Sequence, residues 1–312
     1  MKHKHLLGLE NYSQDEILNI IEHAARFRKV LQRDVKKLPT LRGITIANLF
    51  FEPSTRTRIS FELAEKRLSA DTVNFSASSS SILKGESLRD TVENIEAMKV
   101  DMAVIRHSSP GAPHYIARTC NSVVINAGDG AHEHPTQALL DLYTIHEKFG
   151  SFRGLKITLV GDALHSRVIR SNVFALKTLG AKITLCCPET LMPLGVRNWG
   201  IKVTNDIEEA LQGANVVNVM RLQLERQKSG YLPSLREYAL VWGINKERVA
   251  LMDSDPLIMH PGPMNKGVEI TQEVAYSDQA VILDQVTNGV AIRMAVLYLL
   301  APGRGEYNPE NQ

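Results

Sequence analysis

The fold is constrained most by a regular alternation of short apolar runs with longer amphipathic stretches. The apolar runs have the length and residue content of buried strands, and they lie at 43–51, 72–77, 102–107, 123–127, 156–161, 182–187, 215–220 and 257–260. The stretches between them are helical in pattern, and a further helical run near the start of the chain opens with a capping box formed by Ser13 and Glu16. Strands that alternate with helices form parallel sheets covered by helices on both faces. We therefore predict an α/β protein built from doubly wound, mostly parallel sheets.

The length of the chain predicts two domains, because 312 residues correspond to about two units of roughly 150 residues. A boundary is expected in the segment 149–154, which contains two glycines and follows a helical pattern that begins at Pro135. The first domain is then predicted at 1–149 and the second at 150–288. A last helical run begins near Gly289, and its apolar pattern allows it to pack on either domain.

The composition is that of an ordinary globular protein, with 44% hydrophobic and 22% charged residues. A formal net charge of +2 argues against a protein that coats nucleic acid or a membrane surface. No apolar run approaches the roughly 20 residues that span a bilayer, and too few apolar residues follow the basic first residues for a signal peptide. Cys120, Cys186 and Cys187 form no CxxC pair, so we interpret them as packed thiols and expect a cytoplasmic protein.

The segment 51–62, Phe-Glu-Pro-Ser-Thr-Arg-Thr-Arg-Ile-Ser-Phe-Glu, connects a buried strand to a helix. Pro53 ends the strand. The residues after it open an amphipathic helix in which Ile59, Leu63 and Leu68 recur at near-helical spacing. The functional interest of the segment lies at the start of this helix.

The helix start concentrates groups that bind anions. Ser54 or Thr55 is placed to cap the helix. The hydroxyls of these residues and of Thr57, with the guanidinium groups of Arg56 and Arg58, surround backbone N–H groups that have no partner within the helix. Such a helix start binds phosphate well. The alternative is an ordinary capped helix with two solvated arginines.

Further polar residues follow other predicted strands, at the edge where ligands bind in open parallel sheets. Arg106 ends the strand at 102–107, although an arginine in such a place is often a surface residue. His134 precedes Pro135 at a helix start, where the helix dipole lowers the pKa of an imidazole and keeps it neutral. A neutral imidazole can polarise a carbonyl oxygen. His132 with His134 matches no zinc-binding spacing and the sequence shows no third ligand, so no metal is expected.

The second half offers carboxylate-binding residues and no nucleotide-binding motif. The turn after the strand at 156–161 lacks the G-x-G-x-x-G spacing of dinucleotide-binding proteins, and no P-loop occurs in the chain. Arg167 follows this turn, while Arg221 and Gln223 are expected to be exposed at the end of the strand at 215–220. Each arginine alone is typical of a surface, but together they suit a dianionic amino acid.

Two loops are less informative by composition alone. The serine-rich segment 78–87 contains Ser80 and Lys84 and has the composition of a solvated loop. Pro261 and Gly262 lie in a stiff segment whose carbonyl oxygens can accept a hydrogen bond from an amine. Without further information, a rigid connection is the simpler interpretation of that second loop.

Taken in order, these motifs resemble those of the aspartate and ornithine carbamoyltransferases. Ser-Thr-Arg-Thr-Arg at 54–58 is similar to the phosphate-binding signature of the family, and His-Pro-Thr-Gln at 134–137 is highly specific to it. The resemblance covers nearly the whole chain. It implies that the phosphate of carbamoyl phosphate is bound by Ser54, Thr55, Arg56, Thr57, Ser80 and Arg106, and that the catalytic Lys84 of a neighbouring subunit also contacts it.

The resemblance also assigns roles around the reacting carbamoyl group. It implies that Thr57, Arg106 and His134 contact the carbonyl oxygen. The NH₂ group is then held by Gln137 and by the carbonyl oxygens of Pro261 and Gly262. Ser80 and Lys84 match a loop that, in the family, reaches into the active site of a neighbouring subunit.

The acceptor implied by the resemblance is aspartate. Ornithine-specific relatives carry a His-Cys-Leu-Pro loop where this chain has His-Pro-Gly-Pro at 260–263. The implied aspartate-binding residues are Lys84, Arg167, Arg221, Gln223 and Gly262. One alternative is a carbamoyltransferase with another amine acceptor, such as ornithine. The other is a non-catalytic scaffold of the same fold, which is expected to lack some of Arg56, Lys84, Arg106 and His134, whereas this chain has all four.

The implied reaction converts carbamoyl phosphate and L-aspartate into N-carbamoyl-L-aspartate and phosphate, the committed step of pyrimidine biosynthesis. It requires no metal and no organic cofactor. The resemblance further implies a homotrimer with shared active sites, and it does not distinguish members that work alone from members assembled with regulatory chains or a dihydroorotase. In the family the last helix, here about 289–304, returns to the first domain, which binds carbamoyl phosphate, while 150–288 binds aspartate.

Overall fold

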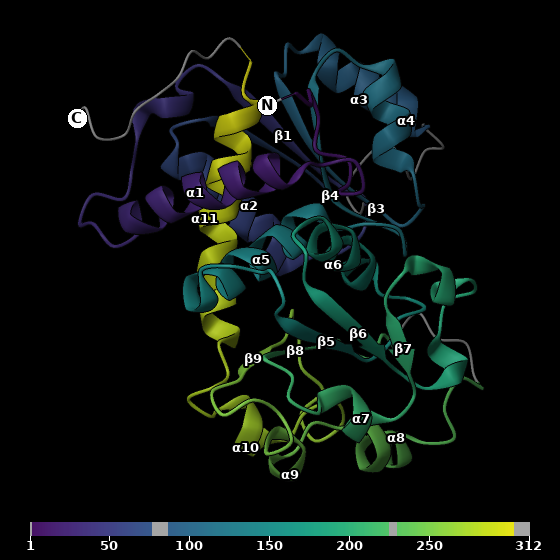
Figure 1. Cartoon of the computed structure of the whole chain (residues 1–312). Coiled ribbons are helices and arrows are strands. Elements are labelled where there is room, and N and C mark those ends of the chain that lie inside the picture. The colour runs from purple at the N-terminus through teal and green to yellow at the C-terminus, as the bar shows by residue number, and fades with distance from the viewer. Residues whose placement is uncertain (1, 77–86, 225–229, 303–312) are drawn as a thin grey trace. The chain divides into compact units, whose positions relative to one another are not determined.

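The computed structural model describes residues 2–76, 87–224 and 230–302. The chain divides into two compact units, one formed by Met1–Tyr143 with Thr287–Gln312 and the other by Thr144–Val286. Each unit contains a parallel sheet flanked by helices (Figure 1). The predicted α/β class with two mostly parallel sheets is confirmed. Within the described residues, no helix is long and apolar enough to cross a membrane.

The sheet of the first unit has four parallel strands in the order β2-β1-β3-β4. They are β1 (Thr45–Phe50), β2 (Asp71–Ser76), β3 (Met102–His107) and β4 (Val123–Asp129). Every residue of β4 is buried, and so is every residue of β1 except the first, as expected for strands covered on both faces. The chain order reverses between β1 and β3, because the chain leaves β1 for β2 on one side and later returns to β3 on the other.

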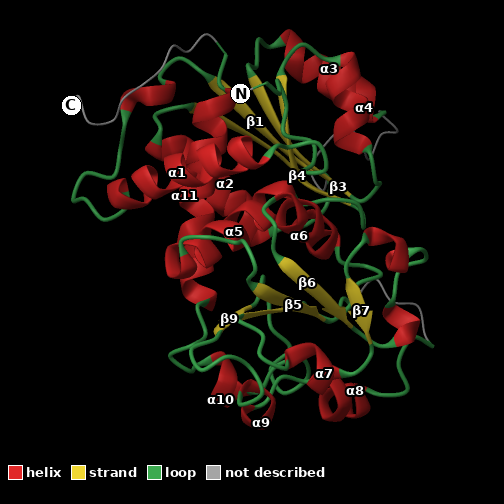
Figure 2. Ribbon diagram, in the orientation of Figure 1, coloured by secondary structure: helices red, strands yellow, loops and turns green. Residues whose placement is uncertain are grey.

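Helices cover both faces of this sheet (Figure 2). On one face, α3 (Leu88–Ala97) and α4 (Ala112–Thr119) share a hydrophobic core with β1, β3 and β4. On the other face, Glu65 of α2 (Thr55–Arg67) accepts a hydrogen bond from Asn48 of β1. The remaining helical elements of the unit are α1 (Gln14–Val30), the short 3₁₀ turn η1 (Pro39–Leu41), the first part of α5 (Pro135–Phe149) and the last part of α11 (Ile282–Leu300).

The last helix is tied to the first unit by hydrogen bonds as well as by apolar packing. Arg293 of α11 donates to the hydroxyl of Ser60 in α2 at 3.0 Å, and Arg28 of α1 donates to the side chain of Asn288 at 3.1 Å. The helix begins at Ile282, seven residues before the start near Gly289 that the sequence indicated. Its first residues include Ile282, Leu283 and Val286, but Leu283 and Val286 are 80% and 55% exposed, so they do not continue the buried apolar face that begins near Gly289.

The second unit has five parallel strands in the order β7-β6-β5-β8-β9. They are β5 (Lys156–Val160), β6 (Lys182–Cys186), β7 (Lys202–Thr204), β8 (Val216–Val219) and β9 (Leu257–Met259). Figure 1 shows α6 (Arg167–Thr178) on one side of this sheet and the short helices α7 (Ile207–Leu211), α8 (Leu235–Trp242), α9 (Lys246–Val249) and α10 (Gln272–Ala275) on the other. The chain order reverses between β5 and β8.

Most strands lie where the apolar runs predicted them, and the capping box at Ser13 and Glu16 is present at the start of α1. Two details differ. Strand β7 was not predicted, because it is three residues long and none of its residues is buried. The buried face predicted for α2 was wrong for two of its three residues. Ile59 and Leu63 are 47% and 39% exposed, whereas Leu68 is buried, together with Phe61, Ala64 and Glu65.

Candidate active site

The polar residues of the first unit gather at the carboxyl ends of its strands, around the point where the strand order reverses. In open parallel sheets this switch point is where ligands bind. The start of α2 follows β1, and Arg106 belongs to β3, the strand beside it. The loop that carries His134 follows β4, the next strand in the sheet.

The start of α2 has the features of an anion site. Ser54 occupies the N-cap position but makes no side-chain cap hydrogen bond, so its hydroxyl is not used by the helix itself. No acidic residue lies in the first turn, which leaves the positive end of the helix dipole uncompensated by the helix's own side chains. Thr57 is buried, whereas Thr55 and Arg56 are exposed. The helix start therefore presents hydroxyls and positive charge where the family signature lies.

Arg106 is held in a fixed position beside this helix start. In the sheet, Arg106 pairs with Phe50, the last residue of β1. Arg106 therefore lies next to the segment that leads into α2. One guanidinium nitrogen, Nη1, donates to the carbonyl oxygen of Ala127 at 3.2 Å, and Nε lies 3.5 Å from a carboxylate oxygen of Glu52. The sequence did not indicate Glu52 as part of the site, although it lies within the segment 51–62.

His134 and Gln137 lie at the start of α5. His134 is buried, and its carbonyl oxygen accepts hydrogen bonds from the backbone N–H groups of Gln137 and Ala138 at 3.0 and 3.2 Å. Pro135 is the first residue of the helix, as predicted. The side-chain amide of Gln137 donates to Asp141 at 3.1 Å, which fixes the orientation of Gln137.

In the second unit, the backbone itself brings the candidate residues to the switch point between β5 and β8. Gly161 follows β5 with φ +126°, and a Cβ added there would lie 2.5 Å from the carbonyl oxygen of Met220, which follows β8. Only glycine permits this close approach. Arg167, the first residue of α6, and Arg221 lie just beyond these two segments. Arg167 is buried, at 5% exposure.

Asp162 joins the two segments. Its carboxylate accepts from the backbone N–H of His165 at 3.1 Å and from that of Gln223 at 3.4 Å. The side-chain amide of Gln223 in turn donates to the carbonyl oxygen of His165 at 3.0 Å. The prediction that Arg221 and Gln223 are exposed was wrong, because both are partly buried. Gln223 is partly buried because its backbone and its side chain are both hydrogen-bonded to the turn before α6.

The loop that contains Pro261 and Gly262 is held by a buried histidine. Nδ1 of His260 accepts from the backbone N–H of Gly262 at 2.8 Å, so its other nitrogen, Nε2, carries the proton and points to Glu269 at 3.3 Å. Glu269 also accepts from the backbone N–H of Asn265 at 2.5 Å. Both His260 and Glu269 are inaccessible to solvent. The sequence indicated a stiff loop from its prolines but not this pair beneath it.

The structure thus brings Ser54, Thr55, Arg56, Thr57 and Arg106 to adjacent strand ends of one unit. Gln223 is hydrogen-bonded to the turn that leads into Arg167, and the side chain of Asn265 donates to the carbonyl oxygen of Leu222, beside Arg221, at 3.3 Å. Ser80 and Lys84 lie outside the described residues.

The three cysteines are free and buried, and burial raises the pKa of the Cys186 thiol to about 12.

Comparison with known proteins identifies the family. Residues 4–147 match the carbamoyl-P binding domain of the aspartate/ornithine carbamoyltransferases, and residues 153–300 match their Asp/Orn binding domain. The chain therefore belongs to the aspartate/ornithine carbamoyltransferase family, and the resemblance seen in its motifs is confirmed.

Within this family, individual relatives are similar over almost their whole length. The aspartate carbamoyltransferase catalytic subunit of Heliobacterium modesticaldum is 57% identical over 304 residues, which cover 97% of each chain. A crystal structure of aspartate transcarbamoylase from Trypanosoma cruzi, in complex with carbamoyl phosphate and aspartate, matches with a TM-score of 0.84 and 32% identity over 94% of this chain and 95% of that one. The ornithine carbamoyltransferase of Pyrococcus furiosus matches with a TM-score of 0.86 and 30% identity over 96% of this chain and 98% of that one.

Proposed function

We propose that this chain is an aspartate carbamoyltransferase, which transfers the carbamoyl group of carbamoyl phosphate to the amino group of L-aspartate. The observation that carries the proposal is the start of α2, where the Ser54 hydroxyl makes no helix cap and no acid lies in the first turn. The name and 57% identity of the relative from Heliobacterium modesticaldum support aspartate as the acceptor. The products are N-carbamoyl-L-aspartate and phosphate, and the reaction places the chain in pyrimidine biosynthesis.

The chemistry is attack of the aspartate amine on the carbonyl carbon of carbamoyl phosphate. A C–N bond forms and a tetrahedral intermediate with a negative oxygen results. Thr57, Arg106 and His134 donate hydrogen bonds to that oxygen, which stabilises the charge as it develops. The C–O bond to phosphate then breaks, and the departing phosphate accepts the proton released by the amine. No general base from the protein, no metal and no organic cofactor are required.

The phosphate is bound at the start of α2 by Ser54, Thr55, Arg56 and Thr57, with Arg106 beside them. The contact of Arg106 with Glu52 at 3.5 Å supports this role, because it orients the guanidinium at the end of β3. The remaining groups around carbamoyl phosphate are His134, Gln137, Ser80, Pro261 and Gly262. The domain formed by 1–149 and about 289–304 is the one that binds carbamoyl phosphate.

Aspartate is bound by residues 150–288, where Arg167 and Arg221 pair with its two carboxylates. Their positions just beyond β5 and β8, at the switch point of that sheet, support this role. Gln223, Lys84 and the carbonyl oxygen of Gly262 complete the site. Holding the amine and the carbamoyl carbon in register contributes much of the rate acceleration.

We further propose that the active form is a cytoplasmic homotrimer in which Ser80 and Lys84 of one subunit complete the active site of the next. This proposal rests on the family resemblance of the segment 78–87, and it requires a closed ring of identical interfaces.

A direct assay tests the proposed function. The purified full-length chain is incubated with carbamoyl phosphate and either L-aspartate or L-ornithine, and the carbamoylated product is measured by a colorimetric reaction. We expect N-carbamoylaspartate and no citrulline. Citrulline as the main product would show an ornithine enzyme, and a folded chain that is inactive with both acceptors would indicate a non-catalytic scaffold.

A further inference from the structure

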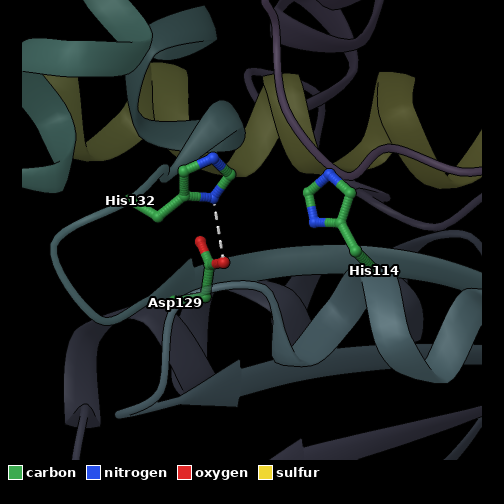
Figure 3. Close-up of side chains that lie close together, drawn as sticks. All are labelled: His114, Asp129 and His132. Atoms are coloured by element: carbon green, nitrogen blue, oxygen red, sulfur yellow. Dashed lines mark hydrogen bonds and ion pairs between the residues drawn. The ribbon is translucent and has the colours of Figure 1, made fainter.

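Three side chains that commonly bind metals come together at the carboxyl end of the first unit's sheet. They are His114 in the first turn of α4, Asp129 at the end of β4 and His132 in the loop that follows. Each offers one ligand atom, and the three atoms all lie within 4.8 Å of one another. Figure 3 shows the ring of His114 with one nitrogen turned toward Asp129 and His132. Among the described residues, no other group of this kind occurs.

The carboxylate of Asp129 is fixed in orientation. Its Oδ1 accepts from the side chain of Asn126 at 2.9 Å and from the backbone N–H of Glu133 at 3.0 Å, and its Oδ2 accepts from the backbone N–H of Gly111 at 2.7 Å. Carboxylates that bind metals are typically held by outer hydrogen bonds in this way.

His114 supplies an independent indication of a binding site. Its Nδ1 is buried and finds no hydrogen-bond partner among the residues that the structure describes. A buried polar atom without a partner is unfavourable and calls for a physical reason. In a neutral imidazole one ring nitrogen carries no proton, and its lone pair can bind a metal ion.

His132 is already aligned with the carboxylate. Its Nδ1 lies 3.0 Å from Oδ2 of Asp129 and donates to it, and its ring lies edge-on to that of His114 with 5.5 Å between the centroids (Figure 3). A tetrahedral zinc ion keeps its ligand atoms about 3.3 Å apart. The spacing of Asp129 and His132 meets this value, and His114 reaches it by a small shift of its side chain. The proton on Nδ1 of His132 moves to Nε2 when a metal takes its place.

The backbone around the three residues is locked. Gly130, between Asp129 and His132, has φ +51°, and a Cβ added there would lie 2.6 Å from Pro110 and 2.8 Å from the carbonyl oxygen of Ser108. The loop that leads into α4 therefore packs directly on the loop that follows β4. The backbone positions of the three residues are therefore set before any ion binds.

We propose that His114, Asp129 and His132 form a binding site for one divalent transition-metal ion. Two imidazole nitrogens and one carboxylate oxygen, with water in the fourth position, suit zinc. In the sequence, His132 was considered as a metal ligand only together with His134. The structure instead places His114 and Asp129 beside it. The ion takes no part in carbamoyl transfer. It joins α4 to the loop that ends at His134, and so stabilises the first unit.

The test uses the full-length chain without an affinity tag, treated with EDTA and dialysed. Isothermal titration with Zn²⁺ is expected to show one equivalent bound per chain, and Co²⁺ is expected to give the intense visible absorption of a four-coordinate site. His114→Phe keeps an aromatic ring against His132 but removes the first imidazole ligand. His132→Gln removes the second imidazole ligand. Each is expected to weaken Zn²⁺ binding at least about tenfold.

A matched control is available in the second unit. Asp162 and His165 have the same spacing as Asp129 and His132 and a similar contact, 2.9 Å, but no third ligand lies near them among the described residues. His165→Gln is expected to leave Zn²⁺ binding unchanged. Saturating Zn²⁺ is expected to raise the melting temperature of the wild type and of His165→Gln, but not of His114→Phe. The stripped His114→Phe protein is expected to melt no lower than the stripped wild type, because the substitution removes a buried nitrogen without a partner.

Failure of the wild type to bind stoichiometric Zn²⁺ would overturn the proposal. So would undiminished binding by His114→Phe, since the ion would then lie on other histidines. These outcomes are separate from the proposed function, because they are read from binding and melting and not from carbamoyl transfer.

Discussion

Glu65 lies on the buried face of α2, near the C-terminal end of that helix, and it should make the stability of the first unit depend on pH. Glu65 is inaccessible to solvent, and its Oε2 accepts from the side chain of Asn48 at 2.9 Å. Burial raises the pKa of Glu65 from 4.5 to about 7, although the hydrogen bond from Asn48 opposes the shift. The folded protein therefore keeps a proton on Glu65 at a pH where the unfolded chain has released it.

The size of the effect follows from this shift. Moving the pKa from 4.5 to about 7 corresponds to about 3 kcal/mol at 1.36 kcal/mol per unit. Below pH 4.5 both states are protonated and Glu65 carries no penalty. As pH rises toward 7 only the unfolded state loses its proton, so the wild type loses up to about 3 kcal/mol of stability, and above about 7 the loss is complete.

Glu65→Gln should remove this dependence. Oε1 of Glu65 and Oδ1 of Asn48 are both buried acceptors without a hydrogen-bond partner among the described residues. Glutamine keeps one oxygen for the amide of Asn48 and replaces the other with a donor. The melting temperature of the variant is therefore expected to exceed that of the wild type increasingly as pH rises from 4.5 to 8, as followed by circular dichroism.

Glu62 on the same helix provides a control of opposite sign. It lies 2.6 Å from Lys66, and its hydrogen bond to that side chain lowers its pKa. Its stabilising contribution is present above pH 4.5 and is lost as pH falls, so Glu62→Gln should be slightly less stable than the wild type near neutral pH. Parallel melting profiles of wild type and Glu65→Gln across this range would refute the reasoning about Glu65.

Three further predictions concern the active site. Arg221→Ala should raise the KM for aspartate strongly and leave carbamoyl phosphate binding close to that of the wild type; equal losses for both substrates would contradict the division of labour between the domains. His134→Ala should lower kcat by about 10²–10³, the usual loss for one donor to an oxyanion, while EDTA leaves the wild-type rate unchanged. Arg56→Ala and Lys84→Ala should each be nearly inactive alone, but refolding them together should restore activity, because one interface in a mixed trimer joins an intact Arg56 to an intact Lys84. Hybrid trimers that stay inactive would rule out a shared site.

The fold was largely predictable because parallel strands buried on both faces are continuous apolar runs. Every run proposed as a strand is one, whereas β7 is too short and polar to be visible in the sequence. The buried face of α2 was not predictable, since it depends on which side of the helix meets the sheet. Glu65 is buried there because Asn48 of β1 pairs with it, and the more apolar Ile59 and Leu63 face outward.

The candidate site was predictable where a motif coincides with a strand end. Ser54 and Arg106 follow from the rule that the carboxyl ends of parallel strands share one edge. Their supporting contacts were not predictable, because they depend on the register between distant segments. Glu52 meets Arg106 only through the pairing of β1 with β3, and His114 meets Asp129 only through the packing of α4 on the end of β4.

The central claim is that this chain carbamoylates aspartate, and a competition experiment tests it most directly. The purified chain is given ¹³C-labelled carbamoyl phosphate with equal concentrations of L-aspartate and L-ornithine, and the labelled products are identified by mass spectrometry. Because Arg167 and Arg221 are proposed to pair with two carboxylates and ornithine has only one, the account predicts labelled N-carbamoylaspartate almost exclusively. Labelled citrulline as the main product, or no labelled product from a folded chain, would contradict it.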